Sequence, residues 1–498
     1  MKKILLLSIC LMSAIMMQAD TFKFTTPEGY SFFCRITDAV NKKVEIDQDP
    51  SLDIYSTESV PHIAHVHIPG TVTHNGDVYT VTKINQFGIA LINTDTLTFG
   101  DDIDMGWQPI LGGSKGKIKN LYFPKNLTIV PNNFGWYMSY VNGSVETVWL
   151  HPGIKKIDFS ALCKIKHLKD FANSNIEEIE TFGLGVFGVS ELIPDLAVLP
   201  QTIRILRRNC FGTSAMPLNK LVIPLSMEEI DGGVYDISGD VYISHMSPFT
   251  IEDNAPFGSQ STLKVHVPVD RSATFAATEK WSAYAEKYYE DVTIGPNGYR
   301  SYYLENENFE VPTGCTAYII TGVTQRGTSG IGDATVVSFP AGSLIPKKTG
   351  FILEGTPNTT IAYRAAVSGT EVNVAGNLLV GTAAEQEFSG AGYKYYLFGK
   401  GAQGQGFYHQ GTRNGNSMRL GAHHAGLRLP AGSGDFAPIR GFFVDFEAAK
   451  QNTVTAISSP TAQTGEAQSA IIYDLQGRRV VSPTRGIYIV NGKKTVIK

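Results

Sequence analysis

The sequence predicts a mainly β protein, in which a solenoid of short stacked repeats precedes an antiparallel β-sandwich module and a short β tail. Three observations support this fold class. A three-residue strand phrase ending in proline recurs between residues 66 and 268, short alternating apolar runs replace it after residue 298, and 50 glycines accompany 10% aromatic residues. A chain of 498 residues is long enough for several domains.

Residues 1–19 are typical of a secretory signal peptide. Two lysines precede an apolar run from Ile4 to Met17, and the small residue Ala19 suits cleavage. Lipidation at Cys10 is the alternative, but Ile9 stands where a lipobox needs a small residue. We therefore expect an exported protein, at the outer face of the outer membrane or extracellular.

The proline phrase is the main signal for the first half of the chain. In LYFPKNLTIVPNNF, a short apolar strand stops at Pro124, and hydrophobic residues return at Leu127 and Val130. Hydrophobic residues return at the same spacing after Pro200 and Pro224, and they form the second half of each repeat. Copies of the phrase begin at Val66, Leu121, Val148, Ala197, Leu221 and Val265, with weaker copies at Leu97, Leu168 and Val241.

The spacing of these copies, roughly 20 to 31 residues, matches a leucine-rich-repeat solenoid. One unit cannot bury its apolar edge alone, so stacked units must build a parallel sheet and a continuous core. The proline lies where the strand no longer needs a backbone donor. The later hydrophobic residues are then expected to fill the same core from the far side.

Two segments, LVIPLSMEEIDGGVY and LPQTIRILRRNCFG, resemble the BspA-like leucine-rich repeats of Bacteroidetes surface proteins. The run from Phe159 through Cys163 to Leu168 is similar to the aromatic, cysteine and leucine positions of that family, although most units here lack its I-G and A-F pairs. The resemblance covers about residues 60–294. It implies a contact surface on the concave sheet for host matrix proteins or other bacterial surfaces.

Both ends of the repeat domain, 61–294, are expected to be capped. Residues 20–60 alternate like a β-hairpin and would cover the first repeat. At the other end, Ser272 is predicted to cap a helix that runs to about Tyr289. The resemblance implies the same helical closure, with apolar contacts from Phe275, Trp281 and Tyr284.

The remainder of the chain divides into three predicted parts. Residues 298–446 form the β-sandwich module, because short alternating runs such as Thr316–Thr321 and Gly441–Phe446 are separated by turns. Residues 447–470 read as a flexible linker. Residues 471–498 resemble the end of a type IX secretion C-terminal sorting domain, which implies export and surface attachment; the alternative is a small closing hairpin.

Candidate chemical sites were weighed individually, and the sequence predicts no catalytic residue, no cofactor and no metal site. His423 and His424 would point to opposite faces of a strand. The acidic run 101–106 lacks the third acidic position of a calcium loop. The pairs 177–178 and 228–229 recur at matching repeat positions, as solvated sites on the outer turn do. An enzyme in the module is a third class, disfavoured by its few acidic residues.

The cysteine positions and the net charge argue against a disulfide-rich protein and against a nucleic-acid-binding protein. Cys34, Cys163, Cys210 and Cys315 are scattered, so we expect buried thiols and no disulfide framework. A formal net charge of −4 with no basic stripe argues against nucleic acid as a partner.

The middle residue of each strand phrase should face the concave surface, because its neighbours enter the core. Tyr122 and Trp149 hold this position in consecutive units, so their rings should touch or stack. The alternative is that these aromatics simply favour strands and are covered. The candidate ligand-binding residues are Tyr122, Trp149, Tyr242, His67 and His266.

The sequence thus predicts a non-catalytic, exported binding or adhesion protein associated with the outer-membrane surface. Its expected partner is a host matrix protein, a bacterial surface protein or a glycan. The alternative function is glycan capture for a polysaccharide-uptake system, with binding by the aromatic pair.

Overall fold

A computed structural model describes the chain from residue 20 to residue 454, with short gaps, and parts of the tail. The expected signal peptide, Cys10, Cys163 and most of the expected linker lie outside the described residues. The chain divides into two compact units, 1–446 and 447–498. No described helix has the length and apolar character needed to cross a membrane. The gaps are 55–58, 107–109, 113–115, 135–143, 163–164, 185–192, 213–214, 254, 328–329 and 432–438; the tail is described at 472–473, 479–480, 485–490 and 493–497.

A five-stranded sheet covers the start of the solenoid, in the order β1-β2-β3-β6-β5. The expected hairpin is present as β1 and β2, which pair antiparallel. The sheet also takes in two strands beyond residue 60, because Val72, Tyr79 and Val81 bury their side chains in the same core. The strands are β1 (Thr21–Thr25), β2 (Ser31–Asp38), β3 (Lys43–Asp47), β5 (Thr71–His74) and β6 (Asp77–Ile84).

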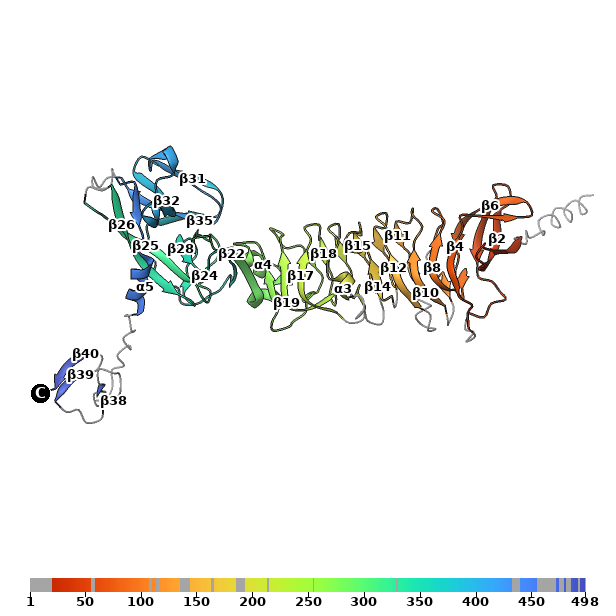
Figure 1. The fold of residues 1–498 in the computed structure, drawn as a ribbon, viewed down its shortest axis with the longest axis horizontal. Helices are drawn as coiled ribbons and strands as arrows, with labels where there is room; N and C mark the ends of the chain where they lie inside the picture. Colours follow the sequence, from red (N-terminus) through yellow and green to blue (C-terminus); the bar gives the residue numbers. More distant parts are fainter. Residues whose placement is uncertain are drawn as a thin grey trace, which may run out of the picture. The chain divides into compact units, whose positions relative to one another are not determined.

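The repeat phrases form a parallel sheet, called here the first sheet, in the order β14-β12-β10-β8-β4 (Figure 1). Leu97, Leu121 and Val148, one in each of three neighbouring strands, are fully buried. This confirms the predicted stacking of the strand phrases. The strands are β4 (Ile63–Ile68), β8 (Asn93–Phe99), β10 (Lys117–Tyr122), β12 (Ser144–Trp149) and β14 (His167–Lys169); β7 (Ile89–Ala90) pairs with β9 (Leu111–Gly112) nearby.

The second half of each repeat forms another parallel sheet, called here the opposite sheet, in the order β11-β13-β15-β16-β18-β20. Each strand has two residues, and the second is buried, as Val130 and Ile230 illustrate. The expectation that these hydrophobic residues fill the core from the far side is confirmed. The strands are β11 (Ile129–Val130), β13 (Lys156–Ile157), β15 (Glu178–Ile179), β16 (Ile205–Leu206), β18 (Glu229–Ile230) and β20 (Thr250–Ile251).

The strand phrases resume in a second sheet, in the order β17-β19-β21-β22-β29. The strand predicted at Ala197–Pro200 is absent; a short helix, α3 (Ile193–Leu196), precedes bends there. Asp195 of α3 accepts a 3.1 Å hydrogen bond from the backbone N–H of Leu168, so its carboxylate satisfies a donor at the edge of β14. The strands are β17 (Met216–Ile223), β19 (Tyr235–Ile243), β21 (Lys264–His266), β22 (Tyr288–Thr293) and β29 (Thr360–Arg364).

The predicted closing helix from Ser272 to Tyr289 is wrong in extent. The structure has a helix α4 (Ser272–Ala277), a 3₁₀ helix η1 (Trp281–Lys287), and then strand β22. Lys280 separates the two helices with a φ of 67°, a left-handed conformation. The hydroxyl of Ser272 bonds Glu290 and not its own helix. Phe275, Trp281 and Tyr284 are buried in the solenoid core, as the sequence predicted.

Among the described residues, the module contains one nine-stranded sheet and two two-stranded sheets, in place of the predicted antiparallel β-sandwich. The order is β23-β28-β25-β26-β36-β33-β32-β35-β30, with only the β26–β36 pair parallel among these neighbours. The sheet curls so that Ser301 of β23 bonds His424 of β35. The strands are β23 (Tyr299–Tyr302), β25 (Thr316–Gln325), β26 (Ile331–Pro340), β28 (Phe351–Glu354), β30 (Leu379–Thr382), β32 (Tyr393–Gly401), β33 (Gly404–Tyr408), β35 (His424–Pro430) and β36 (Gly441–Phe443).

The remaining elements are short. Helix α5 occupies Phe446–Val454, so the expected flexible linker begins with a helix. The tail forms a four-stranded antiparallel sheet of its own. These elements are β24 (Phe309–Glu310) with β27 (Leu344–Ile345), β31 (Gln386–Ser389) with β34 (Ser417–Leu420), the 3₁₀ turn η2 (Gly411–Arg413), and in the tail β37 (Ile472–Tyr473), β38 (Arg479–Val480), β39 (Gly486–Val490) and β40 (Lys493–Ile497).

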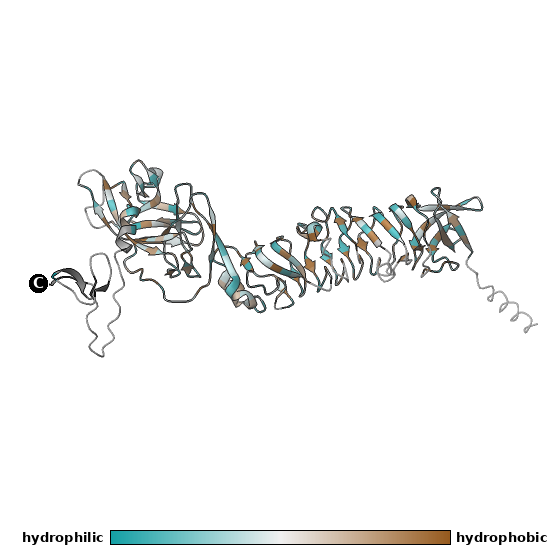
Figure 2. Ribbon diagram, turned by 60° about the horizontal axis from the view of Figure 1, so that its bottom comes forward, coloured by the Kyte–Doolittle hydropathy of each residue, from teal (hydrophilic) through white to brown (hydrophobic). Residues whose placement is uncertain are grey.

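One apolar core extends from Phe22 to Tyr288, through the covering sheet and every repeat. A separate core begins at Val292 and serves the module. Apolar and polar residues alternate along many of the solenoid strands (Figure 2). Cys34, Cys210 and Cys315 are buried and unpaired, which confirms the expectation for these three.

Candidate functional site

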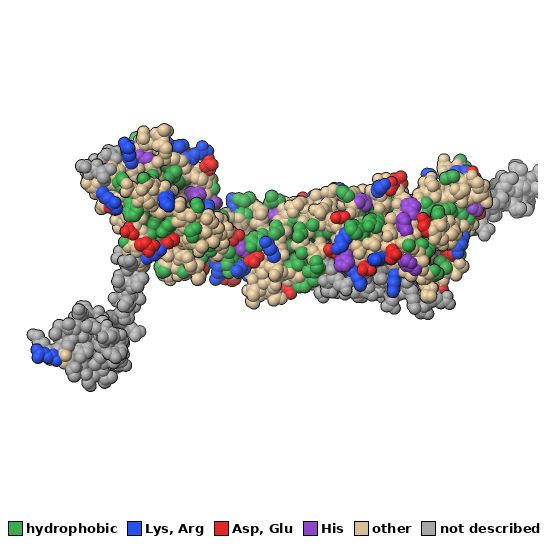
Figure 3. Space-filling view, viewed as in Figure 1, with side chains coloured by type: hydrophobic (Ala, Val, Ile, Leu, Met, Phe, Trp, Pro, Cys, Tyr) green, Lys and Arg blue, Asp and Glu red, His purple; other side chains and the backbone are tan. Residues whose placement is uncertain are grey.

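The outward residues of the first sheet line up in one row across its strands. The pairing register places His67 beside Thr98, and Tyr122 beside Trp149, with Lys169 next. The expected middle positions therefore share one face. Side chains of apolar, basic, acidic and histidine type reach the surface over these strands (Figure 3).

Tyr122 and Trp149 stack as predicted, with ring centroids 5.6 Å apart and planes inclined by 9°. Parallel rings at this separation cannot lie flat side by side, so part of each inner face covers the other ring. Tyr122 remains 38% exposed, whereas Trp149 is half-buried. The pair therefore presents ring edges and the outer face of Tyr122 to solvent.

A second, polar row lies beside the aromatic pair, two residues earlier along each strand. Asn120 is its central member, and its Oδ1 accepts a 3.1 Å hydrogen bond from the indole N–H of Trp149. Thr98 of the first row is bonded by His67 at 2.9 Å and His65 at 3.1 Å. Asn120 was not among the residues predicted from the sequence, although the period of two along a strand places it on the same face as Tyr122.

Ion pairs organise the last strand of the first sheet. Lys169 donates to Asp195 at 3.0 Å, and His167 lies 3.2 Å from the same carboxylate. Burial alone would raise the pKa of Asp195, but the hydrogen bonds from Lys169 and the Leu168 N–H outweigh it and hold that pKa below its usual value. Lys169 is thereby held at the end of the row, two strands from Tyr122.

On the second sheet, Tyr242, His266 and Tyr289 form a continuous stack. Ring centroids are 4.4 Å apart for Tyr242 and His266, and 6.0 Å for His266 and Tyr289. His266 is only 5% exposed, so this predicted contact residue is mostly covered. The sequence predicted that Tyr289 ends a helix, so it did not identify Tyr289 as an outward residue of a strand.

Two carboxylates flank the buried imidazole of His266. Asp240 lies 3.0 Å from its Nε2 and Asp291 lies 3.1 Å from its Nδ1. Burial alone would lower the pKa of His266, but the hydrogen bonds to Asp291 and Asp240 outweigh it, so the pKa is raised. His266 therefore acts as a structural bridge between strands β19 and β22.

The paired glutamates belong to an ion-pair ladder on the opposite sheet, and not to an outer turn as expected. Glu177 lies between Lys155 and Arg204, and Glu228 accepts both Nε and Nη2 of Arg204. Charges of opposite sign thus alternate across neighbouring repeats. This arrangement gives these carboxylates a role in the stack.

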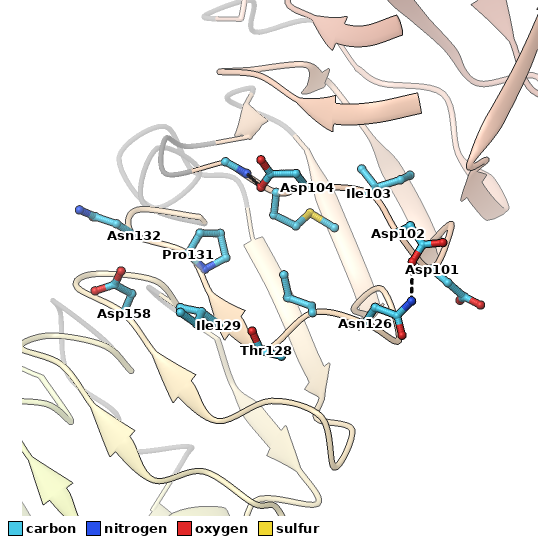
Figure 4. Close-up of a pocket in the computed structure, with 13 residues that line it drawn as sticks. Asp101, Asp102, Ile103, Asp104, Asn126, Thr128, Ile129, Pro131, Asn132 and Asp158 are labelled. Carbon is cyan, nitrogen blue, oxygen red and sulfur yellow. Dashed lines mark hydrogen bonds between the residues drawn. The ribbon is translucent and has the colours of Figure 1, made fainter. Parts of the chain in front are cut away.

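The acidic run 101–106 lines a cavity of about 470 Å³ together with loop residues of the next two repeats (Figure 4). Asn126 donates to Asp102, and Lys125 pairs with Asp101 at 3.4 Å. Within the described residues, no group of three or more acidic, histidine or cysteine side chains is arranged to hold a metal ion.

The two adjacent histidines do not behave as alternating strand residues. His423 has a φ of 56° and precedes β35, so both rings turn toward β23. His423 lies 3.2 Å from the carbonyl oxygen of Tyr303, and His424 lies 3.0 Å from the hydroxyl of Ser301. The expectation of opposite faces is wrong, because the first histidine lies in a turn.

The solved structures similar to this chain include two proteins with leucine-rich repeats. A leucine-rich repeat protein from Bacteroides ovatus ATCC 8483 has 13% identity, with 50% of this chain and 73% of that chain covered and a TM-score of 0.26. A leucine rich cell surface protein from Faecalibacterium prausnitzii A2-165 has 12% identity, with 51% and 90% covered and a TM-score of 0.18. No family model and no curated protein matches the sequence. The function proposed below therefore rests on the residues of this chain.

Proposed function

We propose that this chain is an exported, non-catalytic binding protein whose outward row on the first sheet contacts a partner protein. One observation carries the proposal: the partly exposed Tyr122 stacks on Trp149. Aromatic side chains with little conformational freedom are enriched among residues that dominate protein interfaces. The pair also lies on paired strands, and strands hold their side chains more rigidly than loops do.

The stacking geometry favours a protein over a sugar as first choice. A sugar ring packs its apolar side on the open face of an aromatic ring, and this stack leaves only the outer face of Tyr122 open for such a contact. Ring edges, Lys169 at one end and His67 at the other suit an uneven protein surface with apolar and charged groups. A matrix protein or a bacterial surface protein fits this description, in line with the BspA-like sequence resemblance.

Binding by purified full-length protein tests this proposal. Immobilised matrix proteins and intact bacterial cells would be probed with the native chain, with Tyr122→Ala/Trp149→Ala, and with Tyr393→Ala as control. Tyr393 is 41% exposed and lies in the module, so it matches Tyr122 in exposure but not in place. We expect the double variant alone to lose binding. Equal binding by all three proteins would reject the row as the contact surface.

Glycan capture is the second candidate, and the polar row favours it. Asn120 pairs with Thr96 and Thr147 of the neighbouring strands, beside the aromatic pair. Asn120 and Thr96 are partly exposed and could bond sugar hydroxyls. A glycan array with the native chain and Asn120→Ala would decide. Saturable glycan binding that Asn120→Ala abolishes would support capture, whereas protein binding with an empty glycan array would exclude it.

Export to the cell surface is part of the proposal and rests on the sequence of the two termini. Residues 1–19 have the signal pattern, and residues 471–498 have the sorting-like pattern. Fractionation of cells expressing the full chain or a chain ending at residue 470, combined with surface proteolysis, tests it. We expect the full chain alone to be digested outside intact cells; retention of both forms inside would contradict surface exposure.

A further inference from the structure

The module contains a cavity of about 270 Å³ at the place where its curled sheet brings β23 toward β32, β33 and β35. Tyr299 and Phe398 form apolar walls, and Arg300, Ser301, Gln405 and His424 supply polar groups. The described residues that line it include no acidic side chain. Its volume is near the lower end for small-molecule sites, so it suits a ligand of about monosaccharide size.

Arg300 has one buried donor without a hydrogen-bond partner among the described residues. Its Nη1 donates to the carbonyl oxygen of Thr293 at 3.1 Å. Its Nε is buried and has no hydrogen-bond partner among the described residues. Nε and Nη2 form one edge of the planar guanidinium, and that edge matches the two oxygens of a carboxylate.

Other arginines of this chain show what that edge does when it is satisfied. Arg204 places Nε and Nη2 on the two oxygens of Glu228 at 2.9 and 2.8 Å. Arg413 binds Glu387 in the same way at 3.1 and 2.9 Å, and Arg326 does so with Asp333. Arg300 keeps the same edge next to a cavity, with no described carboxylate on its Nε.

His424 and Ser301 add neutral polar groups to the lining of the cavity. Burial, reinforced by the Arg300 guanidinium, lowers the pKa of His424 to about 4, so the ring is neutral at physiological pH. The Ser301 hydroxyl lies 3.0 Å from His424 Nδ1 and fixes the ring. Arg300 therefore supplies the positive charge beside this histidine, and Ser301 and His424 can bond hydroxyl groups.

We propose that this cavity binds a small carboxylate-bearing ligand, of the size and polarity of a sugar acid, with its carboxylate beside the Arg300 guanidinium. Its hydroxyl groups would bond Ser301, Gln405 and His424, and the ring would pack on Phe398. This site is separate from the outward row of the solenoid and does not depend on it. The described lining residues offer no acidic side chain to neutralise this guanidinium, so a ligand carboxylate would supply the opposite charge.

Calorimetry on the full-length protein at neutral pH tests the proposal with D-glucuronate, D-glucose and sulfate as probes. Glucose keeps the sugar ring and lacks the carboxylate, and sulfate has the charge without the ring. We expect saturable glucuronate binding with a Kd on the order of 1 mM, and no measurable binding of glucose. Absence of glucuronate binding, equal binding of glucose, or binding of sulfate alone would overturn the assignment.

Variants locate the site. Arg300→Gln should weaken glucuronate binding about tenfold or more, since a charge-assisted pair is lost, while Arg413→Gln should leave it unchanged. Arg300→Lys keeps the positive charge but lacks the planar guanidinium, so it should also weaken binding. It replaces Arg300→Gln in the test if that variant does not fold. A ligand-induced change in the NMR signal of His424 should accompany binding. Unchanged affinity in the folded Arg300 variants would place the ligand elsewhere and reject this site.

Discussion

The hydroxyl of Tyr363 donates a 2.6 Å hydrogen bond to the carboxylate of Glu290, directly across the pairing of β29 with β22. Glu290 is completely buried, and it also accepts the backbone N–H groups of Asp270 and Ser272 at 2.8 and 3.2 Å. These donors satisfy the hydrogen-bonding capacity of a side chain that has no access to water. The last repeat and the module are therefore joined around one acidic side chain.

Replacing Tyr363 by phenylalanine should weaken this joint. The change removes the donor and leaves the Glu290 carboxylate short of one partner in a buried site, which should cost about 1.5–3 kcal/mol in the free energy of unfolding. Denaturant unfolding measures the loss. Tyr393→Phe, at an exposed position of β32, should change it little. Equal effects of the two substitutions would contradict an anchoring role for the Tyr363 hydroxyl.

Glu307→Gln should stabilise the protein increasingly as the pH rises. Burial and the neighbouring Glu290 charge raise the pKa of Glu307 to about 9, so the folded state keeps its proton while the unfolded chain loses it above about pH 4.5. Native stability from this group therefore falls between pH 4.5 and 9. Glutamine mimics the protonated form, so the variant's advantage should grow across that window in thermal unfolding.

Glu310→Gln is the matched control for this measurement, because Glu310 lies on the nearby strand β24 and is partly exposed. It separates the effect of replacing a glutamate on this part of the fold from the effect of burial at residue 307. A Glu307→Gln curve parallel to the native one would show that Glu307 is ionised in the folded protein.

The stabilising effect of His266 on the second sheet should also fall as the pH rises, and His266→Gln should remove this pH dependence of the free energy of unfolding. The folded pKa of His266 is raised, so its stabilising effect is complete below the unfolded value near 6.5 and is lost as pH rises through the folded pKa. The native chain should therefore lose more stability than the variant between pH 6 and 9. His62→Gln, at a position about half exposed, controls for replacing a histidine in the same unfolding experiments.

Leu121 and Tyr122 are neighbours in sequence but should respond very differently to alanine. Leu121 is fully buried, and its truncation should cost about 2–5 kcal/mol in the free energy of unfolding. Tyr122 points outward, and its truncation should cost clearly less. Similar losses in denaturant unfolding would mean that the strand is turned over and that the outward row is misassigned.

A double-mutant cycle at Tyr122 and Trp149 should measure their stack directly. Aromatic pairs contribute about 0.5–1.5 kcal/mol beyond the area they bury, and this coupling should appear in the stability of the single and double alanine variants. Tyr122 combined with Tyr393 provides the control pair, which should be additive. Additive effects at Tyr122 and Trp149 would show that the contact gives no net stabilisation.

The sequence predicted those features that depend on local periodicity. The strand phrase, the buried second halves and the Tyr122–Trp149 contact all follow from spacing within one repeat and between neighbouring repeats. Local periodicity could not predict contacts between residues far apart in sequence. Asp195 accepts a hydrogen bond from the edge of β14, and β29 of the module pairs with β22. The burial of His266 was missed for the same reason, since Asp291 and Tyr289 lie in a segment whose helical pattern gave way to sheet pairing.

The antiparallel pairing of β29 with β22 also limits how this molecule can change over evolution. A further repeat needs a parallel edge to extend, and β29 occupies the edge that β22 would offer. At the other end, the covering sheet continues the core of the first repeats. Duplicated units can therefore be accommodated only in the interior of the stack, so changes in repeat number should enter between β4 and β22 and leave both boundary structures intact.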